Sequence, residues 1–139
     1  GNIQLTARFA LPDYAKKLGD EWFLNLNLFK FYVDEEIDYP KRKMPIAYKF
    51  LYTSRYVILI HIPDGYMLDN IPPSKSYHNA VWGFDMKYEQ KGNWVILTQQ
   101  FDNDHLMLTK DQFESWNKVL ENLYPTYKET LSFSKIRTK

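Results

Sequence analysis

Alternating apolar and polar positions run through most of the chain and predict a β-rich fold. Both alternating faces of residues 56–62 are largely apolar, which is typical of a strand that lies inside a sheet and is covered on both sides. Pro63 removes a backbone donor and Asp64-Gly65 favours a turn, so this strand should end there before residues 66–68 resume the apolar pattern. We therefore expect residues 56–62 to form a central strand.

Other segments alternate in the same way, with one apolar face and one mixed or polar face. The further predicted strands cover residues 3–11, 22–32, 46–52, 81–89, 94–101 and 130–136. Residues 90–93 separate two of them and contain Gly92, which can adopt the positive φ that a tight turn requires. We therefore predict a β-hairpin around Gly92, with Asp102 beginning the turn that ends its second strand.

One segment, residues 110–123, repeats its apolar residues at helical spacing instead. Thr109 can cap its first turn, Gln112 stands where a capping-box partner belongs, and Pro125 should end the helix. The expected fold is mainly β: an antiparallel β-sandwich with one amphipathic α-helix near the C-terminus. An α+β fold is the alternative.

Composition bounds what such a domain can do. The 139 residues suit one β-rich domain over residues 1–139, which we expect to be a C-terminal fragment of a larger protein. Eighteen Lys and Arg against 17 Asp and Glu leave a net charge of +1, which offers no field for binding nucleic acid. The chain has no Cys, which excludes disulfides and a thiol nucleophile. It also has no apolar stretch of the ~20 residues that a membrane-spanning helix needs.

A small group of polar residues could carry chemistry. Asp102, Asp104 and His105 combine carboxylates with imidazole and could bind a divalent metal, but the same residues are also common in turns, and we favour the turn. His61 lies within the predicted central strand and is interpreted as a structural histidine. His78 lies in a polar segment without an acid beside it in the sequence. We therefore expect no catalytic residue, no metal, no cofactor and no enzymatic activity in the isolated chain.

Three of the four tryptophans can be placed from the pattern. Trp82 and Trp116 fall on apolar stripes and are predicted to lie in the core. Trp94 lies near the predicted hairpin turn and is the tryptophan most suited to contact a ligand. An exposed ring there could stack on a sugar, with Asp102, Asp104 and His105 as further weak candidates for ligand contact.

Two turn motifs in a fixed order carry a resemblance to a known family. They are Arg42-Lys-Met-Pro-Ile46 and Ile62-Pro-Asp-Gly-Tyr66, the second followed by Ile71-Pro72. With these motifs, residues 3–136 resemble the C-terminal β-rich domain of unknown function that follows the transglutaminase-like domain in exported multidomain proteins of Bacteroides-type bacteria.

The resemblance implies where the domain lies in a longer protein and does not imply a reaction for the domain itself. It implies a catalytic domain upstream in the parent protein and export to the periplasm or cell surface, and no catalytic residue of that family transfers to this chain. We accordingly expect a non-catalytic accessory or interaction module. Its partner would be the upstream transglutaminase-like domain, with a protein or cell-wall glycan as a further partner. The alternative is an independent carbohydrate- or cell-wall-binding module.

Overall fold

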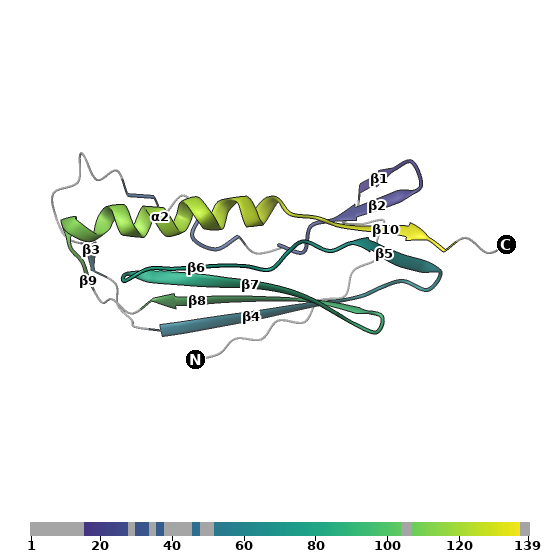
Figure 1. Ribbon diagram of the computed structural model, residues 1–139, viewed down its shortest axis with the longest axis horizontal. Coiled ribbons are helices and arrows are strands. Elements are labelled where there is room, and N and C mark those ends of the chain that lie inside the picture. The colour runs from purple at the N-terminus through teal and green to yellow at the C-terminus, as the bar shows by residue number, and fades with distance from the viewer. Residues whose placement is uncertain are drawn as a thin grey trace.

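The computed structural model shows a mainly β chain with one α-helix near the C-terminus, as predicted (Figure 1). It describes residues 16–27, 30–33, 36–37, 46–47, 52–103 and 107–136. Its strands form two four-stranded antiparallel sheets and a two-stranded ribbon of β3 (Ile46–Ala47) and β9 (Met107–Leu108). The predicted strand over residues 3–11 lies outside the described residues. No helix in the described part of the chain is long and apolar enough to cross a membrane.

The larger sheet is built around the predicted hairpin. Its order is β4 (Tyr52–His61), β8 (Trp94–Asn103), β7 (Trp82–Lys91) and β6 (Lys75–His78). Gly92, with φ of 58°, and Asn93 form the turn between β7 and β8, so the hairpin is confirmed. Among the described strands β4 pairs with β8 alone and lies at an edge, so the central position predicted for residues 56–62 is not seen in the described part of the sheet. The apolar residues on both faces of this strand indicate that both faces are partly covered, and they do not indicate its position in the sheet. Val57 and Leu59 are half-buried on the outer face of β4.

The smaller sheet joins segments that are far apart in the sequence. Its order is β1 (Lys16–Leu18), β2 (Glu21–Leu24), β10 (Leu131–Lys135) and β5 (Tyr66–Asn70). The strand predicted over residues 22–32 ends at Leu24, because the backbone N–H of Asn27 donates to Asn25 Oδ1 at 2.8 Å. Such a local bond competes with the strand ladder. Tyr32, with φ of 65°, then makes a turn inside the predicted strand.

The predicted helix is confirmed with a tighter first turn. A 3₁₀ turn, η1 (Lys110–Gln112), leads into α2 (Phe113–Leu123), and a second, η2 (Tyr124–Lys128), follows it. The backbone N–H of Thr109 donates to Gln112 Oε1 at 3.0 Å, which is the capping contact expected from the sequence.

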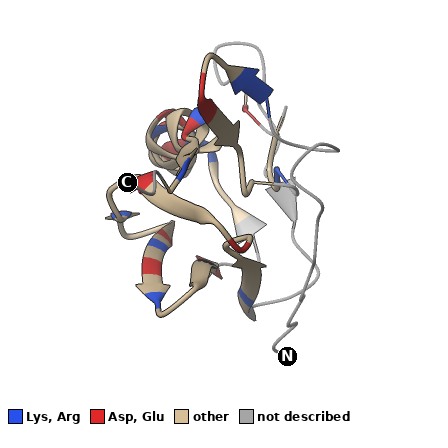
Figure 2. Ribbon diagram, turned by 90° about the vertical axis from the view of Figure 1, so that its right-hand side faces the viewer, with Lys and Arg blue, Asp and Glu red and all other residues tan. Residues whose placement is uncertain are grey.

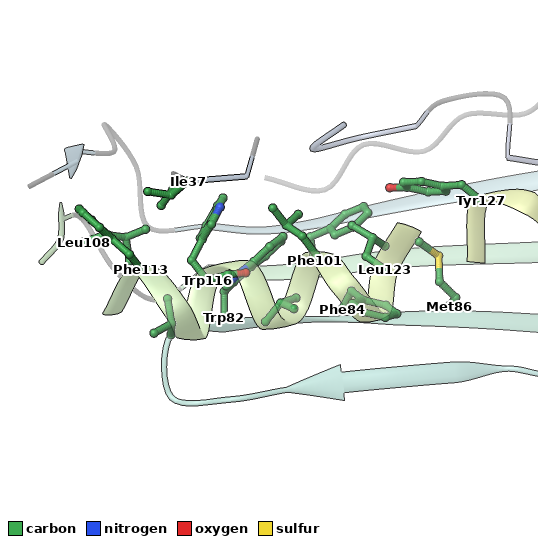
Figure 3. Packing of buried hydrophobic residues seen from close by; sticks show 13 residues of the cluster. Ile37, Trp82, Phe84, Met86, Phe101, Leu108, Phe113, Trp116, Leu123 and Tyr127 are labelled. Atoms are coloured by element: carbon green, nitrogen blue, oxygen red, sulfur yellow. The ribbon is translucent and has the colours of Figure 1, made fainter. Parts of the chain in front are cut away.

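Two cores share the inner face of the larger sheet. Helix α2 covers one end of this face and the smaller sheet covers the other (Figure 1). Under the helix, the rings of Trp82 and Trp116 stack with centroids 4.3 Å apart, and Trp82 Nε1 donates to the Trp116 carbonyl at 3.2 Å (Figure 3). Both side chains are at most 2% exposed, which confirms their predicted place in the core.

A group of buried and half-buried polar residues lies where the two cores meet, and we call it the junction network: Asn25, Asn27, Tyr88, Gln99 and Thr126. On β8, Gln99 stands between Leu97 of one core and Phe101 of the other. Gln99 Nε2 donates to Asn27 Oδ1 at 2.9 Å, and Asn27 Nδ2 donates to the Thr126 carbonyl at 3.0 Å. Asn27 thus ties the loop after β2 to both the sheet and the end of the helix.

Candidate functional site

The outer face of the larger sheet brings together His78 from β6, Asp85 from β7 and Asp102 from β8. One ligand atom from each side chain lies within 4.8 Å of the other two. The strand register explains the convergence: His78 is opposite Gly83, and Gly83 is opposite Asp102. Asp85 is two residues further along β7 and so points to the same side of the sheet. We call these three side chains the outer cluster.

Gly83 makes room for the imidazole. A Cβ atom at residue 83 would lie 2.1 Å from His78 Nδ1 and 2.4 Å from His78 Cγ. The missing side chain therefore lets the ring lie flat across β7. From there His78 Nε2 lies 2.9 Å from Asp85 Oδ2, with both side chains about two-fifths exposed: 43% and 40%.

Hydrogen bonds orient both carboxylates of the outer cluster. Ser76 Oγ donates to Asp85 Oδ1 at 2.5 Å, and Gln100 Nε2 makes longer contacts to the two oxygens of Asp102, at 3.5 and 3.4 Å. The Asp85 carboxylate therefore lies between the Ser76 hydroxyl and the His78 imidazole. In a nucleophilic triad the imidazole lies between the hydroxyl and the acid. The order of these contacts fits ligand binding better than nucleophilic catalysis.

The sequence found one member of this cluster and missed two. Asp102 is the member that the sequence identifies as a candidate. The predicted end of the strand at Asp102 is wrong, because β8 continues to Asn103. Asp104 and His105 lie outside the described residues. The hairpin turn at Gly92 already fixes the pairing of residue 83 with 102 and of 85 with 100. What the sequence did not show is that the polar residues 75–78 form a strand beside β7 and present His78 there.

Trp94 and His61 form a second contact on the outer face. They are opposite each other on β8 and β4, with ring centroids 4.9 Å apart in an edge-to-face arrangement. His61 is exposed, because the alternation of β4 places it on the outer face. Its interpretation as a structural histidine stays a prediction. Trp94 is half-buried against it and keeps only part of its ring accessible.

A hollow of about 1140 Å³ lies at the end of the smaller sheet that is farthest from α2. Its exposed apolar residues are Leu18, Met67 and Ile136, which are 74%, 50% and 48% exposed. Lys17, Asp20 and Glu21 also line it. Figure 2 shows β1 in blue and the start of β2 in red. Apolar residues surrounded by charges of both signs are typical of a surface that binds another protein.

Comparison with known proteins identifies relatives of the domain. Residues 20–133 match DUF3858, described as a domain of unknown function with a solved structure. No curated protein matches the chain. A crystal structure described as a "putative protease" from Parabacteroides distasonis ATCC 8503 has the same fold, with a TM-score of 0.69 at 13% sequence identity. The match covers 96% of this chain and 27% of that chain.

Proposed function

The chain belongs to the DUF3858 family of domains of unknown function, and from this premise we propose that it is a non-catalytic accessory module that docks on a catalytic domain of its own longer protein. The sequence resemblance suggests a transglutaminase-like domain as that partner. The same resemblance suggests that the complete protein acts in the periplasm or at the cell surface.

The observation that carries the proposal is the place of this fold in a larger protein. The Parabacteroides protein matches nearly all of this chain but extends far beyond it, since the match occupies 27% of its length. A domain that is one quarter of a longer polypeptide has its neighbours tethered at high effective concentration, so even a modest surface can hold them together. The description of that protein names a protease, which is consistent with a catalytic neighbour.

The hollow beside the smaller sheet is the surface that suits such docking. Among the described residues, four large apolar side chains are exposed, and three of them, Leu18, Met67 and Ile136, line this hollow. A partner that covers them would remove apolar surface from water, and the charged rim would fix its orientation. The fourth, Val33, lies away from the hollow beside Tyr124 and Tyr127, which makes it a matched control.

The test uses the longer parent protein with lysine substitutions in this domain. Leu18→Lys combined with Met67→Lys should lower the unfolding temperature of the catalytic domain and reduce its activity, because a charge in the interface opposes docking. Val33→Lys adds one such charge elsewhere and should leave both quantities unchanged, so Leu18→Lys and Met67→Lys are also compared with it one at a time. Circular dichroism of the isolated chain checks that each variant folds.

Deletion of residues 3–139 from the parent protein is the experiment that can contradict the docking proposal. If the catalytic domain keeps its stability and activity without them, the docking proposal is wrong. A glycan array on the isolated chain then decides for the carbohydrate-binding alternative: binding of a defined glycan that Trp94→Ala abolishes would establish it.

A further inference from the structure

We propose that the outer cluster of His78, Asp85 and Asp102 is a binding site for a divalent transition-metal ion, with Zn²⁺ as the ion that fits best. The site is independent of the docking surface: it lies on the outer face of the larger sheet, and none of its residues lines the hollow.

The donor set indicates the class of ion. One imidazole nitrogen and two carboxylate oxygens are ligands that Zn²⁺ accepts, in sites with three protein ligands and a fourth position for water. Ca²⁺ and Mg²⁺ prefer oxygen ligands alone, so the imidazole disfavours them. With two carboxylates against one imidazole, the cluster also has the negative charge that a divalent cation requires.

The geometry is close to what binding needs. Zn–N and Zn–O bonds of about 2.0–2.2 Å place tetrahedral ligand atoms about 3.3–3.6 Å apart. His78 Nε2 and Asp85 Oδ2 are 2.9 Å apart, and no pair among the three ligand atoms exceeds 4.8 Å. Small rotations of exposed side chains are enough to close the remaining difference, since the strands that carry them are fixed by the ladder.

Supporting contacts surround the ligands as they do in many metal sites. Ser76 holds the Asp85 carboxylate and Gln100 contacts that of Asp102, so both acids already have an outer partner. Gly83 supplies the space in which the imidazole reaches the acids. A bound ion would connect three strands and so hold the short β6 to the hairpin of β7 and β8.

The experiment is a calorimetric titration of the untagged chain with ZnCl₂, repeated with CaCl₂. We expect one Zn²⁺ per chain, weaker binding of Ca²⁺, and a rise in unfolding temperature with Zn²⁺ concentration. His78→Gln and Asp102→Asn should each weaken Zn²⁺ binding about tenfold or more. His61→Gln and Asp64→Asn change one exposed histidine and one exposed acid outside the cluster and should bind Zn²⁺ as the parent chain does.

Two results would overturn the site. One is the absence of binding up to about 1 mM Zn²⁺, at which a specific three-ligand site should be occupied. The other is unchanged binding in His78→Gln; loss of binding in His105→Gln would then assign the ion to His105 instead. Asp85→Asn provides a further ligand variant, and circular dichroism of every variant separates loss of binding from loss of folding.

Discussion

The two faces of the larger sheet use polar residues in opposite ways. On the inner face, Gln99 is fully buried and donates to Asn27 within the junction network. Three residues further along the same strand, Asp102 faces outward into a half-exposed cluster with His78 and Asp85. A buried polar group is costly unless it is paired, whereas an exposed one exchanges its partner for water at little cost. We infer that the inner group stabilises the fold and that the outer group is available to a ligand.

The largest effect should come from the apolar core between the inner face and α2. Trp116→Ala removes a fully buried ring that stacks on Trp82, and we expect it to lower the free energy of unfolding by about 3–5 kcal/mol. Trp94→Ala is the matched control on the outer face, where the ring is only half-buried. Urea unfolding of the two variants measures the difference, and equal losses would contradict the distinction between the faces.

The sequence predicted the inner face better than the outer face, for a physical reason. Core positions repeat with the period of their own element, so the stripe of α2 and the alternation of β7 could be recognised without knowing what they contact. The outer cluster depends on register between strands, and His78 is in a segment whose polar residues resemble a loop. Likewise, the end of β2 depends on one side-chain hydrogen bond of Asn25, which no hydrophobic pattern reports.

The second prediction tests the polar part of the inner face. Asn27→Ala deprives Gln99 Nε2 of its acceptor, whereas the Thr126 carbonyl keeps the Glu129 N–H as a donor. Because the Gln99 amide stays buried, we expect a loss of up to about 3 kcal/mol in the free energy of unfolding. Gln100→Ala, next to Gln99 but on the outer face, should change it by less than about 0.5 kcal/mol. A small effect of Asn27→Ala would show that water replaces its side chain.

The third prediction concerns the close packing beneath the outer cluster. Gly83→Ala places a Cβ atom against the His78 ring and 2.7 Å from His78 Cα, so we expect a loss of about 2 kcal/mol. His78→Ala alone should cost far less, because its side chain is exposed. In the double variant part of the clash disappears, so the two effects should not add. Chemical unfolding of all four proteins in this cycle measures the coupling, and simple additivity would mean that the ring is not what the new atom meets.

The smallest effect should come from a single buried hydroxyl and should depend on pH. Tyr127 Oη donates to the Phe31 carbonyl at 2.8 Å, and burial raises the pKa of Tyr127 above its ordinary value near 10. Above pH 10 the unfolded chain therefore releases this proton while the folded chain keeps it, and the stability that the neutral phenol contributes is lost progressively as the pH rises.

Tyr127→Phe should cost about 1 kcal/mol at neutral pH, since the hydrogen bond from Tyr127 Oη to the Phe31 carbonyl is lost. Its stability should also fall less steeply than that of the parent chain from pH 10 upward, because the titrating group is gone. Urea unfolding at several pH values between neutrality and this range compares the two slopes. If Tyr127→Phe keeps the slope of the parent chain, the alkaline loss of stability arises from other groups, and the Tyr127 hydroxyl stabilises the fold through its hydrogen bond alone.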